Sequence, residues 1–166
     1  SELVEVMTKF LEEDGRFGCW TFDYAGWPKV SRDLIESVNE LQFLERELGL
    51  ASRESILVLD IGAGYGRLAH RMTGAYPQGT DYCCVDAIAE STFLAEYYLE
   101  HRGIVPPARV VPLHEMEATL QPGAFDLAVN IHSFSECTLQ AVEWWVGYLA
   151  RLGVPASACM FVDDML

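Results

Sequence analysis

An apolar segment that runs directly into a glycine-rich turn constrains the fold of this chain more than any other feature. The run Ile56–Ile61 is apolar except for Asp60, and Gly62, Gly64 and Gly66 follow it at alternate positions. An apolar run bounded by glycine is typical of a buried parallel strand. Alternate glycines allow a tight turn and a close approach of the backbone to a ligand. The pattern therefore predicts a strand, a ligand-binding turn and a helix in succession.

Beyond this turn, apolar segments that suit strands alternate with segments that suit helices. We predict strands at residues 56–61, 82–85, 110–111, 125–131 and 158–162, and helices at residues 66–75, 91–101 and 139–152. Alternation of this kind implies right-handed crossovers and a mainly parallel sheet with helices on both faces. We therefore expect an α/β fold, Rossmann-like, with a sheet of about five strands.

The N-terminal part of the chain follows a different pattern. We predict an amphipathic helix over residues 1–13, and a longer helix that begins after Ser31 as N-cap and ends at Gly49. Between these helices lies an aromatic segment that we interpret as a loop or lid, with Phe17, Trp20, Phe22, Tyr24 and Trp27. We divide the chain into residues 1–50, the N-terminal helices and lid, and residues 51–166, the ligand-binding core, within one compact domain.

Composition argues against several classes of function. The formal net charge is -14, so the chain lacks the basic surface that nucleic-acid binding needs. The five cysteines are odd in number and form no Cys-x-x-Cys pair, which favours a reducing, cytoplasmic compartment over a disulfide framework or a zinc site. No apolar stretch is long enough to cross a bilayer. We expect a small molecule as partner, and neither nucleic acid nor a membrane.

Histidine and tryptophan positions add little evidence for a ligand site outside the turn. No two of the four histidines are close in sequence, and we predict no metal site. The alternative is the pair Asp163–Asp164, which would ligate a divalent cation with help from residues outside this chain. His70 and His101 fall in predicted helices and are expected at the surface. Trp144 and Trp145 are expected in the core rather than against a ligand.

Two ligand classes compete for the glycine turn. A dinucleotide site expects a glycine at position 67 in its Gly-x-Gly-x-x-Gly pattern, but Arg67 stands there. Asp60 lies two residues before the first glycine, where a carboxylate would repel a pyrophosphate and attract a cationic amine. S-adenosylmethionine carries an ammonium and a sulfonium, so we expect this cofactor and keep NAD as the alternative. A purely structural turn is the third interpretation.

Further candidate residues follow other predicted strands, because open α/β sheets bind ligands at the carboxyl ends of their strands. Asp86 ends the second strand, where a carboxylate accepts hydrogen bonds from ribose hydroxyls in either cofactor class. His132 follows the fourth strand and is the candidate general base, with Glu136 to orient it or to bind substrate. The alternative for Asp86 is a solvated acid at a strand end, and the alternative for the segment that holds His132 and Glu136 is a polar loop that only satisfies backbone groups. The predicted cofactor site comprises Asp60, Gly62, Ala63, Gly64, Tyr65, Asp86, Ala87, Asn130 and Ile131.

Taken together, these motifs resemble those of class I S-adenosylmethionine-dependent methyltransferases. The resemblance rests on residues 59–66, on Asp86 and on residues 125–127. More narrowly, the chain is similar to sugar O-methyltransferases of bacteria in residues 31–34, 64–68, 96–99 and 130–136. The resemblance implies methyl transfer to a small hydroxylated acceptor, such as a sugar or a secondary metabolite. It also implies a longer sheet that ends in an antiparallel hairpin.

The C-terminal end of the chain departs from that family pattern. Only residues 163–166 follow the last predicted strand, which is too few for a C-terminal hairpin, so we expect the hairpin to be lacking. We interpret the chain as truncated or as part of a larger polypeptide. An NAD-dependent oxidoreductase and a methyltransferase-like module without catalytic activity are the alternatives to an active methyltransferase.

Overall fold

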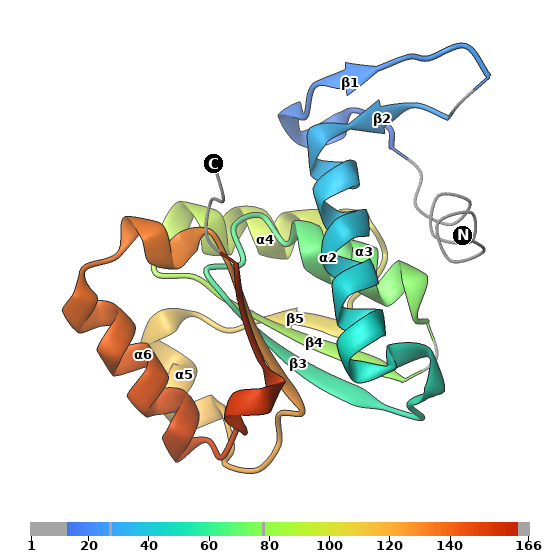
Figure 1. The fold of residues 1–166 in the computed structure, drawn as a ribbon. Coiled ribbons are helices and arrows are strands. Elements are labelled where there is room, and N and C mark those ends of the chain that lie inside the picture. The colour runs from blue at the N-terminus through green and yellow to red at the C-terminus, as the bar shows by residue number, and fades with distance from the viewer. Residues whose placement is uncertain (1–12, 27, 78, 163–166) are drawn as a thin grey trace.

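A parallel sheet forms the centre of the computed structural model, which describes residues 13–26, 28–77 and 79–162 (Figure 1). The sheet has five strands in the order β5-β4-β3-β6-β7. These strands are β3 (Ile56–Ile61), β4 (Thr80–Val85), β5 (Ala108–Val110), β6 (Leu127–Ile131) and β7 (Cys159–Val162). The chain moves outward from β3 to β5 and then returns to the other side of β3, so a ligand crevice is expected between the ends of β3 and β6. The predicted α/β fold is confirmed, and no antiparallel hairpin extends this sheet within the described residues.

Helices cover both faces of the sheet, as predicted. One face packs against α2 (Arg32–Leu48), α3 (Arg67–Ala75) and α4 (Ala89–His101), and the other against α5 (Met116–Thr119) and α6 (Leu139–Arg151). Short 3-10 helices lie between these elements: η1 (Arg16–Gly18), η2 (Leu50–Ser52), η3 (Leu113–Glu115), η4 (Ser133–Glu136) and η5 (Ala156–Ala158). None of the helices among the described residues is both long and apolar enough to span a membrane.

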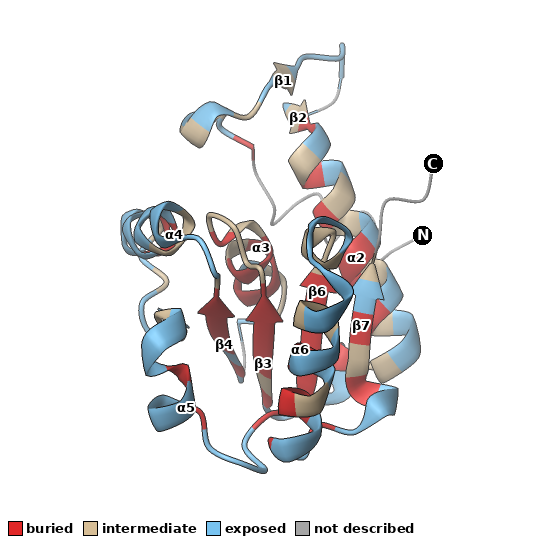
Figure 2. Cartoon of the chain, turned by 90° about the vertical axis from the view of Figure 1, so that its left-hand side faces the viewer, coloured by how far each residue is buried: buried red, intermediate tan, exposed pale blue. Residues whose placement is uncertain are grey.

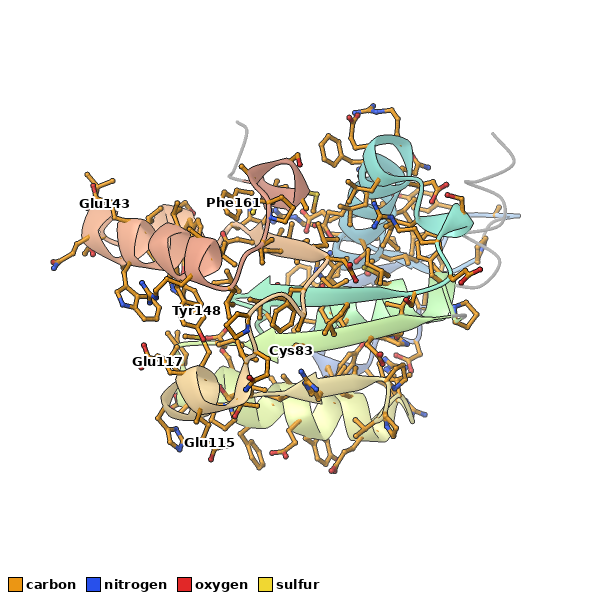
Figure 3. All side chains as sticks on the ribbon, turned by 90° about the horizontal axis from the view of Figure 1, so that it is seen from below. Cys83, Glu115, Glu117, Glu143, Tyr148 and Phe161 are labelled. Carbon is orange, nitrogen blue, oxygen red and sulfur yellow. The ribbon has the colours of Figure 1, made fainter. Side chains whose placement is uncertain are left out.

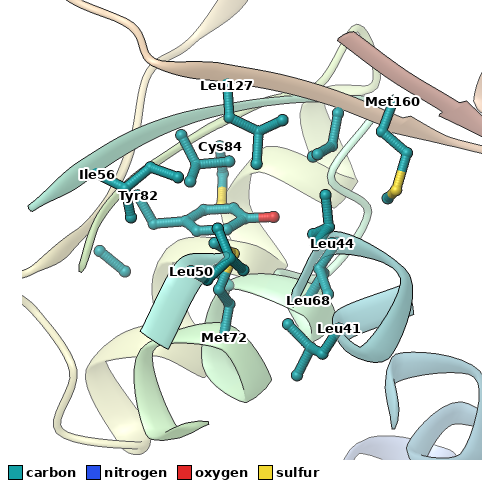
Figure 4. Packing of buried hydrophobic residues seen from close by; sticks show 14 of the residues in the cluster. Leu41, Leu44, Leu50, Ile56, Leu68, Met72, Tyr82, Cys84, Leu127 and Met160 are labelled. Carbon is teal, nitrogen blue, oxygen red and sulfur yellow. The ribbon is translucent and has the colours of Figure 1, made fainter. Parts of the chain in front are cut away.

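Buried side chains concentrate on the strands (Figure 2), because the central strands are covered on both sides. Successive residues of a strand point to opposite faces. Tyr82 and Cys84 therefore join the core under α2, α3 and α4 (Figure 4), whereas Cys83 and Val85 join the core under α5 and α6. The adjacent cysteines Cys83 and Cys84 thus lie on opposite faces of the sheet.

The helix after residue 31 begins and ends as its sequence indicates. Ser31 Oγ accepts a hydrogen bond of 2.9 Å from the Leu34 backbone N–H, and Gly49 closes the helix in the left-handed conformation with φ 62°. These are the N-cap and C-cap geometries that the two residue types favour. The α2 helix thus starts at the hairpin and runs along the sheet (Figure 1).

The aromatic segment is folded rather than a simple loop. β1 (Thr21–Phe22) and β2 (Val30–Ser31) form an antiparallel hairpin that stands beyond the carboxyl ends of the sheet strands (Figure 2). Trp20, Phe22 and Tyr24 are exposed on it, at 83%, 49% and 60%. The predicted helix over residues 1–13 lies outside the described residues except for its last position, and so do Trp27 and the pair Asp163–Asp164.

Two predictions need correction, one for His70 and one for Trp144. His70 is not a free surface residue, because its Nδ1 lies 2.7 Å from the Tyr98 hydroxyl and burial lowers its pKa to about 4. His101 is exposed, as predicted. Trp145 is only 8% exposed and lies in the core, as predicted. Trp144 is 43% exposed and stacks on Tyr148 instead of entering the core.

Candidate functional site

The three glycines of the turn after β3 have different surroundings. All three adopt left-handed φ values of 74° at Gly62, 56° at Gly64 and 85° at Gly66. A Cβ on Gly62 would lie 2.1 Å from Ser133 Oγ, so packing against the loop after β6 requires a glycine at this position. A Cβ on Gly64 would meet no atom within 4 Å, which leaves open space in front of its backbone. Gly66 packs against Leu99 of α4.

Asp86 follows β4 and binds the glycine turn that follows β3. Its Oδ2 accepts a 2.9 Å hydrogen bond from the Gly64 backbone N–H, and its Oδ1 accepts one of 2.8 Å from Ile88. A carboxylate has about four lone-pair sites, so two remain for ligand hydroxyls. The neighbouring Ala87 is exposed, which leaves this corner of the sheet accessible.

Asp60 is a buried acid at the carboxyl end of β3. It is 3% exposed, and its Oδ2 accepts a 2.9 Å hydrogen bond from the Tyr82 hydroxyl on β4. Burial raises the pKa of Asp60 to about 7, although the Tyr82 hydrogen bond and the positive charge of Arg67 act in the opposite direction. A ligand cation near Asp60 would favour its ionised form, because an opposite charge at short range lowers a carboxyl pKa.

Asp60 and Asp86 line two different cavities. A cavity of about 180 Å³ lies at the glycine turn and is lined by Asp60, Gly62, Ala63, Gly64, Tyr65, Arg67, Leu68, Ile131 and His132. A larger cavity, of about 960 Å³, begins at Asp86 and Ala87 and extends between η3, α5 and α6. Figure 3 shows Glu117 on α5 near Tyr148 on α6, the two helices that border this cavity. Most of the predicted site residues thus line one of these two cavities.

The large cavity has walls that the sequence did not single out as a site. Leu113, Met116, Trp144 and Trp145 give it apolar surface, and Thr138 and Gln140 add polar groups. Trp144 and Trp145 therefore both face this cavity, and Trp145 is also part of the core. Mostly apolar lining with a few polar groups is typical of small-molecule sites.

The loop after β6 is held by Asn130. Its side chain is fully buried, its Nδ2 donates to the Ile61 carbonyl at 2.7 Å, and its Oδ1 accepts from the Phe134 backbone N–H at 3.1 Å. Asn130 Nδ2 also contacts Ser133 Oγ. These bonds tie the loop to the end of β3. Asn130 is therefore placed as a support beneath the site, and its contact with a cofactor stays a prediction.

His132 has an unusual backbone conformation. Its φ is 63° and its ψ is -24°, in the left-handed region that few residues other than glycine adopt, although histidine tolerates it better than most. Such conformations cluster at functional sites. His132 lines the small cavity beside Asp60, whereas Glu136 is exposed and lines neither cavity.

The α2 helix supports the glycine turn from the N-terminal side. The Tyr65 hydroxyl donates to Asp33 Oδ2 at 2.7 Å, and Arg67 Nη2 pairs with Glu40 Oε1 at 2.9 Å. The guanidinium of Arg67 is thus engaged with an acid. Sequence reasoning missed Asp33, Glu40 and Tyr82 as neighbours of the site. Of these, Tyr82 could have been found, because alternation along two adjacent strands can place it on the same face of the sheet as Asp60.

No family model and no curated protein sequence matches the chain. Among solved structures, it is similar to PKMT2 from Rickettsia typhi in complex with AdoHcy, at 20% identity and a TM-score of 0.56, over 72% of this chain and 24% of that one. It is similar to the PH0226 protein of Pyrococcus horikoshii OT3, at 17% identity and a TM-score of 0.56, over 74% of this chain and 57% of that one. It is also similar to DszA carbon methyltransferase, at 18% identity and a TM-score of 0.53, over 76% of this chain and 33% of that one.

These likenesses concern the fold. The chain spans less than two thirds of the length of each of the three structures. The structure has the parallel sheet and, after β3, the glycine turn that the sequence resemblance implies. The chain therefore has the Rossmann-like fold of class I S-adenosylmethionine-dependent methyltransferases.

Proposed function

We propose that this protein binds S-adenosylmethionine and transfers its methyl group to a hydroxyl of a small acceptor. The observation that carries the proposal is the position of two acids around one open turn. Asp60 lines the small cavity, Asp86 lies at the mouth of the large one, and the Gly64 backbone lies between them. A ligand with a cationic amine at one end and a nucleoside at the other fits this order.

The residues present fit each part of that cofactor. Asp60 would hold the ammonium, the open backbone at Gly64 would admit the chain next to it, and Asp86 would accept hydrogen bonds from the ribose hydroxyls. The apolar walls beyond Ala87 would cover the base. When bound, S-adenosylmethionine supplies a methyl group that its sulfonium sulfur makes electrophilic.

A dinucleotide fits the turn less well. A pyrophosphate requires backbone N–H groups or cations, and it is repelled by a carboxylate. The Gly64 N–H donates to Asp86, and Arg67, the cation nearest the turn, is paired with Glu40. These contacts favour S-adenosylmethionine over NAD.

His132 is the proposed general base. It lines the cavity that holds Asp60, and its imidazole would accept the proton of the acceptor hydroxyl. The loop bonds of Asn130 would fix its position, and alignment of acceptor and methyl group is itself a large part of catalysis. Glu136 is proposed to orient His132 or to bind the acceptor.

A sugar or a similar hydroxylated metabolite is the proposed acceptor class. Support comes from three of the segments that resemble bacterial sugar O-methyltransferases, which meet in space: Tyr65 donates to Asp33 and packs edge-on against Tyr98, with ring centroids 5.1 Å apart. The hairpin stands beyond the carboxyl ends of the strands (Figure 2), and it carries exposed aromatic residues. Aromatic rings combine a flat apolar face with a polar edge, which suits a partly apolar, hydroxylated ligand.

Calorimetric titration with S-adenosylhomocysteine tests the cofactor proposal. We expect the unaltered protein to bind it and the Asp86→Ala variant to bind about 10- to 100-fold more weakly, because hydrogen bonds to a charged group contribute about 1.5–3 kcal/mol. The matched control is Asp81→Ala, which removes an exposed acid from β4, the strand that precedes Asp86, and should leave the affinity unchanged. Thermal melts verify that both variants fold. No binding by the unaltered protein, or binding of NAD in its place, would contradict the proposal.

Turnover measurements test the proposed base. We expect His132→Ala to lower the rate of S-adenosylhomocysteine release about 10²- to 10⁴-fold with an acceptor found by screening small sugars and phenols, while cofactor affinity stays the same. His101→Ala, which removes an exposed histidine of α4, serves as the control. Full turnover by His132→Ala would remove this residue from the role.

A further inference from the structure

Tyr82 is a fully buried tyrosine whose hydroxyl reaches the candidate cofactor site. Its side chain is 0% exposed and lies within the core between the sheet and the helices α2 and α3 (Figure 4). The hydroxyl donates to Asp60 Oδ2 at 2.9 Å. Burial raises the pKa of Tyr82 well above its usual value, so the phenol keeps its proton and remains a donor.

Strand pairing fixes this contact. In the parallel pair β3 and β4, Val58 lies opposite Tyr82 and Asp60 lies opposite Cys84. Because side chains alternate along a strand, Asp60 and Tyr82 point to the same face, two positions apart. The ring spans that diagonal distance, and its neighbours Leu50, Met72 and Leu44 surround it (Figure 4). The hydroxyl therefore has little freedom to leave Asp60.

The contact uses one oxygen of the Asp60 carboxylate. Within the described part of the chain, the Tyr82 hydroxyl is the side-chain donor to Oδ2, and no side-chain donor bonds to Oδ1. Asp60 nevertheless lines the small cavity at the glycine turn. Oδ1 is thus the oxygen that the residue can offer to a ligand there.

Charges from the neighbouring elements act on Asp60 in opposite directions. Arg67 of α3 favours its ionised form, whereas Glu40 of α2 and Asp86 after β4 disfavour it. Arg67 is itself paired with Glu40 at 2.9 Å, so much of its charge is already compensated. The Tyr82 hydroxyl is the direct hydrogen-bond donor that opposes the effect of burial on this carboxylate.

We propose that Tyr82 is a positioning residue for amino-group recognition: its hydroxyl holds Oδ2 of Asp60 and leaves Oδ1 directed at the small cavity, so that the site selects nucleosides that carry an ammonium group. The inference rests on the proposed function. It differs from the function itself because it assigns the discrimination to a residue that does not touch the ligand.

Two probes measured over a range of pH test the role of Tyr82. S-adenosylhomocysteine carries the amino group, and 5′-methylthioadenosine lacks it. In the unaltered protein, affinity for S-adenosylhomocysteine should rise as the pH rises through 7, because Asp60 ionises there. In Tyr82→Phe this rise should move to higher pH, so that affinity at pH 7 falls about tenfold and recovers by pH 8.5. Affinity for 5′-methylthioadenosine should be equal in both proteins at every pH.

A matched control and a second variant make the outcome decisive. Tyr76→Phe removes a hydroxyl that donates to Glu45 at 3.2 Å, away from both cavities, and should leave the pH profile unchanged. If Tyr82→Phe does not fold, Tyr82→Met takes its place, since methionine adapts to core gaps and also lacks the hydroxyl. Identical pH profiles in the unaltered and variant proteins would overturn the inference while leaving the cofactor proposal intact. Failure of the unaltered protein to bind S-adenosylhomocysteine at any pH would instead overturn the proposed function.

Discussion

Replacing Arg71 by methionine is expected to lower the free energy of unfolding by about 3–5 kcal/mol, because it leaves a buried acid without its partner. Arg71 Nη2 lies 3.0 Å from Glu13 Oε2, and the two side chains are 4% and 2% exposed. Glu13 also accepts hydrogen bonds from Ser31 Oγ and from the Gly15 backbone, so it cannot turn towards water without breaking them. Urea unfolding followed by circular dichroism at pH 7 measures the change.

Two controls separate this effect from the loss of any arginine. Arg46→Met removes an exposed ion pair with Glu47 and should change stability by less than about 1 kcal/mol. The double variant with Glu13→Gln and Arg71→Met should recover part of the loss, because it removes the uncompensated charge. The expectation is wrong if Arg71→Met destabilises the protein no more than Arg46→Met does.

This ion pair also bears on the organisation of the site. Glu13 belongs to the segment that leads into the hairpin, and Arg71 belongs to α3, the helix that follows the glycine turn. A second pair, between Asp14 and Arg102 at 2.8 Å, attaches the same segment to α4. These two ion pairs thus connect the segment before the hairpin to the helices that flank the glycine turn.

The core of the fold was predictable because its signals are local. The run Ile56–Ile61 is apolar over its whole length apart from Asp60, and both Ser31 and Gly49 are capping residues next to a helical pattern. The hairpin was not predictable in the same way. Each of its strands has only two residues, which are too few to show an alternating pattern. The helix α5 was not predicted because its four residues are too few to show a helical period.

The site was predictable in its parts but not in its contacts. Glycine at position 62 suggested a ligand, but the sequence could not show that a Cβ there would also clash with Ser133, which lies far along the chain. Asn130 was predicted as a cofactor contact, but no local pattern indicated that its side chain would also bond the Ile61 carbonyl and the Phe134 backbone N–H. The pairing of Arg67 with Glu40 and of Glu13 with Arg71 depends on how helices pack, which no local pattern encodes.

Replacing Asp60 by asparagine is expected to raise the stability of the protein and to weaken cofactor binding. The pKa of Asp60 is about 7 in the folded protein and near 3.9 in an unfolded chain. Below pH 4 the group is neutral in both states, and between pH 4 and 7 only the unfolded chain ionises. Folding stability due to Asp60 is therefore lost as the pH rises over that interval, by an amount on the order of 2–4 kcal/mol.

Asparagine keeps the shape of the side chain and can still accept the Tyr82 hydrogen bond, but it carries no charge to lose. The unfolding free energy of Asp60→Asn should thus exceed that of the unaltered protein at pH 8 and differ little from it near pH 4.5, with Asp81→Asn as the exposed control on β4. Affinity for S-adenosylhomocysteine should fall at least tenfold at pH 8, because the ammonium loses its partner. An equal stability difference at both pH values would mean that burial does not hold Asp60 in its neutral form. A stable variant that binds poorly would mean instead that the fold tolerates a destabilising acid at the end of β3 because the ligand requires its charge.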